Sequence, residues 1–157
     1  MKPNIGINDS QRGAVVEILD TLLADEYLLY TKTRNYHWNV VGPQFNDLHK
    51  FFEAQYDELD TILDEVAERT RALGGNALGT LTEFVQRARL KEQPGKYPDA
   101  KAMLAVLTAD HETLIRHHRA DADVVATTHG DAGTNDFLVG LTEQHEKMAW
   151  MLRAFQE

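Results

Sequence analysis

The segment NYHWNVVGPQFNDLHKFFE, residues 35–53, decides how the first half of the chain folds. It contains two histidines twelve positions apart, His37 and His49, and Glu53 follows the second by four positions. The glycine and proline of VVGPQ, residues 40–44, predict a short turn between two helices. A connection this short makes the helices antiparallel neighbours, so His37 at the end of one lies beside the start of the other.

Outward from this turn, apolar residues at three- and four-residue spacing predict four long helices. Their expected bounds are 10–38, 46–73, 98–128 and 134–156. Asn46 or Asp47 is the expected cap of the second helix, and the glycines at 74–75 end it. Residues 74–97 form a longer crossover, in which TLTEFVQRA predicts a short helix. Two helical hairpins joined by a long crossover indicate an all-α, ferritin-like four-helix bundle.

The composition excludes several classes of protein. The 157 residues suit one domain spanning 1–157, and 43% of them are hydrophobic, which is enough to build a core. The absence of cysteine excludes disulfides and thiolate metal sites and favours a cytoplasmic location. We expect no membrane span, because no apolar run reaches roughly 18 residues, and no signal peptide, because MKPNIGINDSQRG at the start has no apolar core. A formal net charge of −9 disfavours nucleic-acid binding and favours the attraction of cations.

The second predicted helix carries a polar stripe away from its apolar face. At about 100° per residue, this stripe comprises His49, Glu53, Asp60, Asp64 and Glu68. A solvated acidic face is the ordinary interpretation of such a stripe, and a metal site is the alternative. One chain cannot close that site by itself, because His49 and Glu68 lie about 28 Å apart along a helix.

Two copies of this helix, paired about a two-fold axis, remove that obstacle. In an antiparallel pair, two positions face each other when their numbers have a fixed sum. His49 with Glu68 has the same sum as Glu53 with Asp64, so one register pairs both sets and produces the site twice. His37 adds a second imidazole. Two imidazoles and three carboxylates suit iron, manganese or zinc, and bridging carboxylates can hold two metal ions.

The quoted segment, followed by DEVAERTRALGG at 64–75, resembles the Dps family of starvation-induced mini-ferritins. The resemblance covers nearly the whole chain. It implies ferritin-like subunits in a hollow homododecamer, with a di-iron (Fe) ferroxidase centre between two-fold-related subunits. Carried over position by position, it implies five iron ligands, His37, His49, Glu53, Asp64 and Glu68. Many family members have aspartate at the position of Glu53, so that side chain is one methylene longer here.

The resemblance also implies an activity. A ferroxidase of this family would oxidise Fe²⁺ to Fe³⁺, preferentially with hydrogen peroxide rather than oxygen, and store it as a ferric mineral in the dodecamer. This combines iron storage with protection against oxidative stress. A nucleoid-associated DNA-binding protein is the alternative, and a shell with an inactive centre is a third. Direct DNA binding is not expected, because only Lys2 and Arg12 precede or begin the first helix and the chain ends in AFQE.

Three residues near the expected centre or the last turn have two interpretations each. Trp38 follows His37 and is expected to pack, with a redox role beside the iron as the alternative. Asp131 and Asp136 flank the last turn, and a solvated turn is their ordinary interpretation. The resemblance implies instead that aspartates in this region line pores through which iron enters.

The remaining histidines carry weaker signals. His145 lies on the apolar face of the fourth predicted helix, and we expect a hydrogen-bonded core histidine rather than a ligand. The histidines of the third helix could face the cavity of the shell, although no spacing assigns them a role: His111, His117 and His118.

Overall fold

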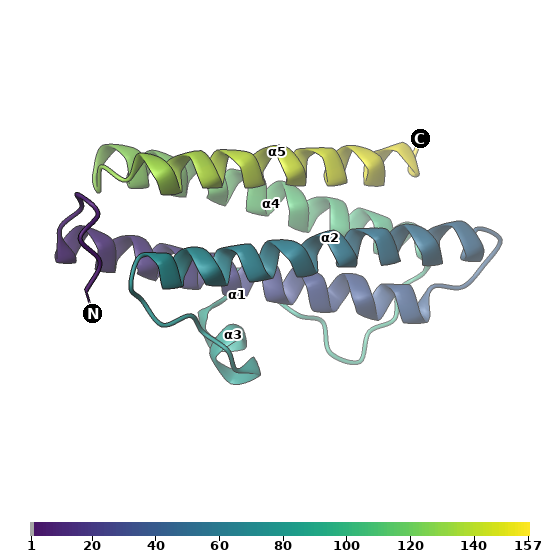
Figure 1. Ribbon diagram of the computed structural model, residues 1–157. Helices are drawn as coiled ribbons and strands as arrows, with labels where there is room; N and C mark the ends of the chain where they lie inside the picture. Colours follow the sequence, from purple (N-terminus) through teal and green to yellow (C-terminus); the bar gives the residue numbers. More distant parts are fainter. Residues whose placement is uncertain (1) are drawn as a thin grey trace.

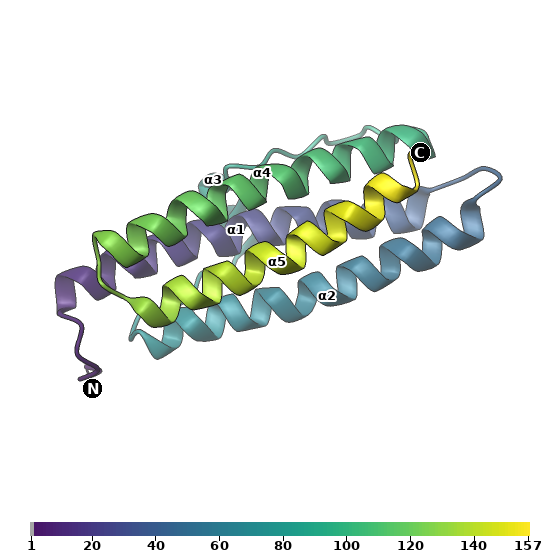
Figure 2. The ribbon, with the colours of Figure 1, turned by 90° about the horizontal axis from the view of Figure 1, so that it is seen from above.

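A computed structural model describes residues 2–157, which form five α-helices and no strand. The helices are α1 (Asp9–Asn39), α2 (Phe45–Ala72), α3 (Leu81–Arg87), α4 (Ala100–Thr127) and α5 (Ala132–Ala154). Figure 1 shows two antiparallel hairpins, α1 with α2 and α4 with α5, stacked on each other, with α3 outside the bundle beside α1. In Figure 2 the four long helices follow a common direction, and the two termini lie at opposite ends. The predicted four-helix bundle with a short helix in its crossover is confirmed.

The core is built from apolar side chains at alternating three- and four-residue spacing. In α2 this stripe is fully buried, as predicted, and consists of Leu48, Phe52, Leu59, Ile62 and Val66. Burial of each such side chain contributes about 1.5–3 kcal/mol, so the stripes hold the two hairpins together. Within residues 2–157, no helix is both long and apolar enough to cross a membrane.

The start of α2 differs from the prediction. Asn46 and Asp47 do not cap it, because the helix already begins at Phe45 after Gln44. Among residues 2–157, the Gln44 side chain makes no capping hydrogen bond. The Leu48 N–H donates to the Gln44 carbonyl at 3.0 Å as the first hydrogen bond of the helix, and the Phe45 N–H donates to the Gly42 carbonyl of the turn at 3.1 Å. Asp47 lies in the first turn, where its charge interacts favourably with the helix dipole.

The other helix ends follow local chemistry more closely. Gly74 ends α2 with a φ of +86°, a conformation that glycine adopts without strain. Thr80 and Glu83 form a capping box at the start of α3. α4 begins at Ala100 rather than at residue 98 as predicted, and the side chain of its cap, Asp99, accepts from the Ala102 N–H.

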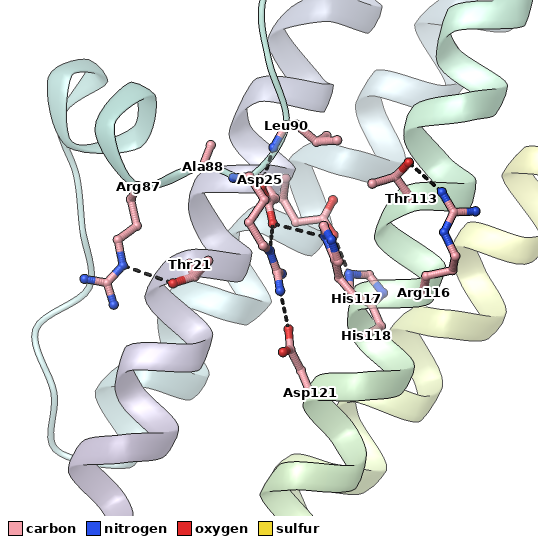
Figure 3. A network of polar contacts seen from close by, with 12 residues as sticks. Thr21, Asp25, Arg87, Ala88, Leu90, Thr113, Arg116, His117, His118 and Asp121 are labelled. Atoms are coloured by element: carbon pink, nitrogen blue, oxygen red, sulfur yellow. Dashed lines mark hydrogen bonds and ion pairs between the residues drawn. The ribbon is translucent and has the colours of Figure 1, made fainter.

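A buried carboxylate fixes the crossover against the bundle. Asp25 of α1 accepts hydrogen bonds from the backbone N–H groups of Arg89 at 2.6 Å and Leu90 at 3.0 Å, and from Arg89 Nε at 2.7 Å. Arg89 also pairs with Asp121 of α4 at 3.0 Å. Figure 3 shows Asp25 between the crossover and α4, with His117 and His118 close by. This network joins α1, the crossover and α4.

Candidate metal centre

His37 and His49 face each other across the α1–α2 turn. Their rings stack, with centroids 3.8 Å apart and an angle of 19° between the planes. His37 Nδ1 lies 2.7 Å from the His49 carbonyl oxygen, and His49 Nδ1 lies 2.9 Å from the His37 carbonyl oxygen. Because a carbonyl oxygen only accepts, each Nδ1 carries the proton. In the form of the ring that binds metal, the lone pair is therefore on Nε2.

Two aromatic side chains complete the surroundings of this histidine pair. The Tyr56 ring is perpendicular to His37 at 5.2 Å, and the Phe45 ring stacks on His49 at 5.2 Å. The Tyr56 hydroxyl lies 3.5 Å from Glu53 Oε1. Burial and the charge of Glu53 raise the pKa of the Tyr56 phenol, so it stays protonated beside that carboxylate. Neither aromatic was predicted from the sequence to belong to this centre, although spacings of four and seven residues from His49 place Phe45 and Tyr56 on the same side of α2.

The two remaining predicted ligands lie towards the other end of α2. Asp64 and Glu68 are exposed, as is Glu53. Because α2 is one uninterrupted helix, Glu53 and Asp64 are separated by about 16 Å along its axis. One subunit therefore places His37 and His49 beside the Tyr56 ring, whose hydroxyl reaches Glu53, but it does not bring all five ligands together. That a second subunit completes this ligand set stays a prediction.

Asp64 and Glu68 line an open groove between α1, α2 and α3. Its volume is about 940 Å³, and Asp60 also contributes to it. Apolar side chains from two other elements, Tyr27 of α1 and Leu81 of α3, form part of its walls.

Trp38 does not pack into the core of the subunit. It is 65% exposed, and the Arg34 guanidinium lies 5.3 Å from its ring centroid. The expectation of packing therefore does not hold within one chain, although a neighbouring subunit could cover the ring. Its redox role stays a prediction.

The two aspartates of the last turn occupy different environments. Asp131 is buried and caps α5, accepting from the Thr134 N–H at 3.0 Å and pairing with Arg69 at 3.2 Å. Asp136 is exposed. Because the Asp131 oxygens are already occupied, Asp136 is the better placed of the two to attract a passing cation, and its pore role stays a prediction.

A second group of possible ligands lies inside the bundle. Glu26 of α1, His111 and His118 of α4, and His145 of α5 are completely buried. The expectation that His145 belongs to the core is confirmed. It is not fully hydrogen-bonded, however, because its Nε2 has no partner within residues 2–157. The histidines of the third predicted long helix, which is α4, were expected to be able to face the cavity of the shell. This is wrong for His111 and His118, which lie in the core of the bundle.

Our sequence analysis did not single out Glu26. Its signal was nevertheless present, because Glu26 takes the place between Leu22 and Leu29 in the buried stripe of α1. Burial acts to raise the pKa of Glu26, but the neighbouring His145 and His118 outweigh it and hold that pKa well below its usual value. Burial, together with His145, holds the pKa of His111 well below the ordinary value of histidine.

The comparisons with known proteins agree with this fold. Residues 16–157 match the ferritin-like domain family. The DNA protection during starvation protein 2 of Bacillus anthracis is 38% identical over 142 residues, which cover 90% of this chain and 95% of the relative. The chain belongs to the Dps family of ferritin-like proteins.

Two further comparisons show how far the likeness extends. An uncharacterised low temperature-induced protein of a Nostoc species is 50% identical over 154 residues, covering 98% of this chain and 86% of the relative. The crystal structure of a Vibrio cholerae Dps protein superposes with a TM-score of 0.92 at 29% identity, covering 99% of this chain and 97% of that one. That protein is described as a member of a broad superfamily of ferritin-like diiron-carboxylate proteins.

Proposed function

We propose that this Dps subunit assembles into a hollow dodecamer that oxidises Fe²⁺ with hydrogen peroxide and stores it as a ferric mineral in the cytoplasm. The observation that carries the proposal is the reciprocal pairing of His37 and His49. Each backbone carbonyl fixes the tautomer of the opposite ring, so two Nε2 lone pairs are available before iron binds. Hydrogen bonds of this kind are typical of histidines that ligate metals.

The complete centre would draw on two subunits. His37, His49 and Glu53 come from one chain, and Asp64 and Glu68 come from the two-fold-related chain. Exposed apolar side chains border the histidine pair in the single subunit, and these are Trp38, Val41 and Phe45. Their burial against the partner would stabilise the same interface that completes the ligand set.

Iron is the substrate of the reaction. Each of two Fe²⁺ ions loses one electron, hydrogen peroxide accepts both, and its O–O bond breaks. With two protons the products are two Fe³⁺ ions and two water molecules. Because the electrons are delivered as a pair, no hydroxyl radical needs to be released. Glu53, Asp64 and Glu68 stabilise the added positive charge, and hydrolysis of Fe³⁺ then yields the oxyhydroxide.

Direct binding of DNA is the competing function, because the Bacillus anthracis relative is named for DNA protection. The two cations near the start of the chain are already paired. Lys2 pairs with Asp9 at 2.5 Å, and the buried Arg12 donates to the Leu73 carbonyl at 2.8 Å. We expect no gel retardation of DNA at moderate salt and neutral pH. A stable, salt-sensitive complex formed without added divalent metal would favour the competing function.

The variant His37→Ala/His49→Ala tests the proposal. Removing only a hydrogen-bond partner of a metal ligand weakens metal binding or activity roughly 10- to 100-fold. Removing both imidazole ligands is therefore expected to slow peroxide-driven oxidation by at least about tenfold. Assembly should persist, because neither ring belongs to the apolar core. Stopped-flow absorbance and size-exclusion profiles provide the two measurements. His129→Ala, outside the centre, is the matched control, and oxidation at the parent rate in the double variant would refute the proposal.

A further inference from the structure

The interior of the bundle contains a set of side chains that the proposed ferroxidase centre does not use. Glu26, His118 and His145 come from three different helices, and all three are completely buried. They take positions in the apolar stripes of their helices, where leucine is the ordinary occupant. Figure 3 shows His118 directed from α4 towards α1, next to the Asp25 network. Burying these polar groups without partners costs folding free energy, so a ligand bound to all three would stabilise the fold.

The donor atoms are close enough to bind one ion. Glu26 Oε1 lies 3.1 Å from His145 Nε2 and 3.3 Å from His118 Nε2. One donor atom from each residue can be chosen so that all three lie within 4.8 Å of one another. Metal–ligand distances of about 2.0–2.2 Å place the donors of a tetrahedral or octahedral site about 3.0–3.5 Å apart. The two measured separations fall in that interval.

Hydrogen bonding within the subunit does not account for these contacts. Among the residues that the structure describes, neither Glu26 oxygen, neither His118 nitrogen, nor His145 Nε2 has a hydrogen-bond partner. The separations are short, but the ring N–H directions do not meet the oxygen with hydrogen-bond geometry. At these separations the carboxylate and the rings form ion pairs only if the imidazoles are protonated. Polar atoms that converge at complete burial without a hydrogen bond are rare in native proteins. A cation between them would satisfy the carboxylate and both imidazoles together.

We propose that each subunit holds one divalent transition-metal ion, with zinc as the preferred ion, between Glu26, His118 and His145 inside its own bundle. Two imidazoles and one carboxylate are a ligand set typical of this ion class. The ion joins α1 to the α4–α5 hairpin and needs no second subunit. The site is independent of the proposed ferroxidase function, because none of its ligands belongs to that centre.

His111 acts as a positioning residue for the same site. Its Nδ1 lies 3.0 Å from His145 Nδ1, and the two rings are 5.0 Å apart. When His145 Nε2 binds the ion, the proton of the ring is on Nδ1. This N–H then donates a hydrogen bond to His111 Nδ1. This bond fixes the tautomer and the orientation of the His145 ring, as outer partners of metal-bound histidines do.

Cobalt(II) is the probe that tests the site, because its visible absorption reports the ligands. The parent for this experiment is the His37→Ala/His49→Ala protein, which lacks the imidazoles of the surface centre. Because the interior site is completely buried, cobalt is supplied during expression. We expect one Co²⁺ per subunit after desalting, X-ray absorption that shows two imidazole ligands, and loss of the visible bands when the protein is prepared with zinc instead.

Three variants in that background assign the ligands. Glu26→Gln and His118→Gln should each retain less than a tenth of the bound cobalt, and His111→Leu should weaken binding roughly 10- to 100-fold. Glu146→Gln is the matched control, because Glu146 is a carboxylate on α5 that pairs with Arg119 at the surface. It should keep one ion per subunit.

Several results would overturn the site. These are a background protein without bound cobalt, cobalt bound without imidazole ligands, or cobalt content unchanged by Glu26→Gln. If a buried variant fails to assemble, the imidazole count in the background protein still decides. Failure here leaves iron oxidation by the protein with intact His37 and His49 untouched, so it is distinguishable from failure of the proposed function.

Discussion

The imidazole rings of His37 and His49 stack 3.8 Å apart, and the Nδ1 of each donates to the backbone carbonyl of the other. This relationship ties the last turn of α1 to the first turns of α2. It means that the short connection between the helices does more than reverse the chain. It holds the buried His37 and the half-buried His49 in a fixed tautomer, beside exposed apolar residues where a second subunit is expected, so little reorganisation is needed when iron binds.

The buried Asp25 should be important for stability, although it is outside both proposed metal sites. Asp25→Ala leaves the Leu90 N–H and the Arg89 guanidinium without this acceptor. Breaking a buried pair of this kind costs about 3–5 kcal/mol. At about 2–4 °C per kcal/mol for a chain of this length, the Tm should fall by about 6–20 °C in a thermal scan.

Glu17→Ala provides the control for that measurement. Glu17 also lies on α1 and pairs with an arginine of the crossover, Arg87, but this pair is at the surface. Exposed pairs contribute about 0.2–1 kcal/mol, so its Tm should change by less than about 4 °C. Similar losses in the two variants would show that Asp25 does not fix the crossover.

Substitution by alanine should change stability in opposite directions at Gly75, which is closely packed, and at Gly140, which is not. A Cβ on Gly75 would lie 2.7 Å from Val16 Cγ1, so Gly75→Ala should destabilise by about 1–3 kcal/mol. At Gly140 in α5, a Cβ meets no heavy atom of residues 2–157 within 4 Å, so Gly140→Ala should stabilise by about 0.5–1 kcal/mol.

Denaturant unfolding of a double variant checks the proposed contact. Val16→Ala removes the methyl groups that the new Cβ would meet. Gly75→Ala and Val16→Ala should therefore cost less together than the sum of the two single changes. Strict additivity would mean that this contact is not the cause.

Asp20 should make stability depend on pH. It is buried on α1, and its Oδ1 has no hydrogen-bond partner in the described part of the chain. Burial raises the pKa of the Asp20 carboxyl above its ordinary value of 3.8. The folded state therefore binds the Asp20 proton more tightly than the unfolded state does. This contribution to stability is fully present below about pH 3.8 and is lost as the pH rises through the pKa of the folded state.

Asp20→Asn removes the unfavourable charge. Its Tm should exceed that of the parent at about pH 7, and the difference should shrink towards about pH 3, where Asp20 is protonated in both states. Thermal scans at both pH values decide the point, and a difference independent of pH would rule out titration as the cause.

Local pattern was sufficient to predict most of the fold. The buried stripe from Leu48 to Val66 follows directly from helical periodicity, and Gly74 ends α2 because its φ is positive. The start of α2 could not be predicted, because residue type favoured a cap at Asn46, whereas the helix follows the turn directly and the Phe45 N–H bonds the Gly42 carbonyl of that turn. Boundaries of this kind depend on the geometry of the turn.

The sites were less predictable because they depend on contacts between helices. Periodicity places Glu26 and His145 in core stripes but cannot show that they meet, which requires the packing of α1 against α5. Similarly, the stacking of His37 on His49 follows from the geometry of the turn. The assignment of Asp64 and Glu68 to a partner subunit came from symmetry and the family resemblance, and one subunit by itself does not test it.

Two variants with incomplete centres, co-expressed in equal amounts, test the shared centre most directly. One lacks the imidazoles, His37→Ala/His49→Ala, and the other lacks the distal carboxylates, Asp64→Asn/Glu68→Gln. Each alone should oxidise iron slowly. Native mass spectrometry shows whether the two chains mix in one assembly, and stopped-flow absorbance measures peroxide-driven oxidation of Fe²⁺.

If two subunits share each centre, a mixed pair contains one centre with all five ligands and one with none of the four replaced side chains. Random mixing makes half of the pairs mixed, so about one quarter of the centres, and about one quarter of the parent rate, should be recovered. Mixed assemblies that oxidise iron no faster than either variant alone would contradict the shared centre.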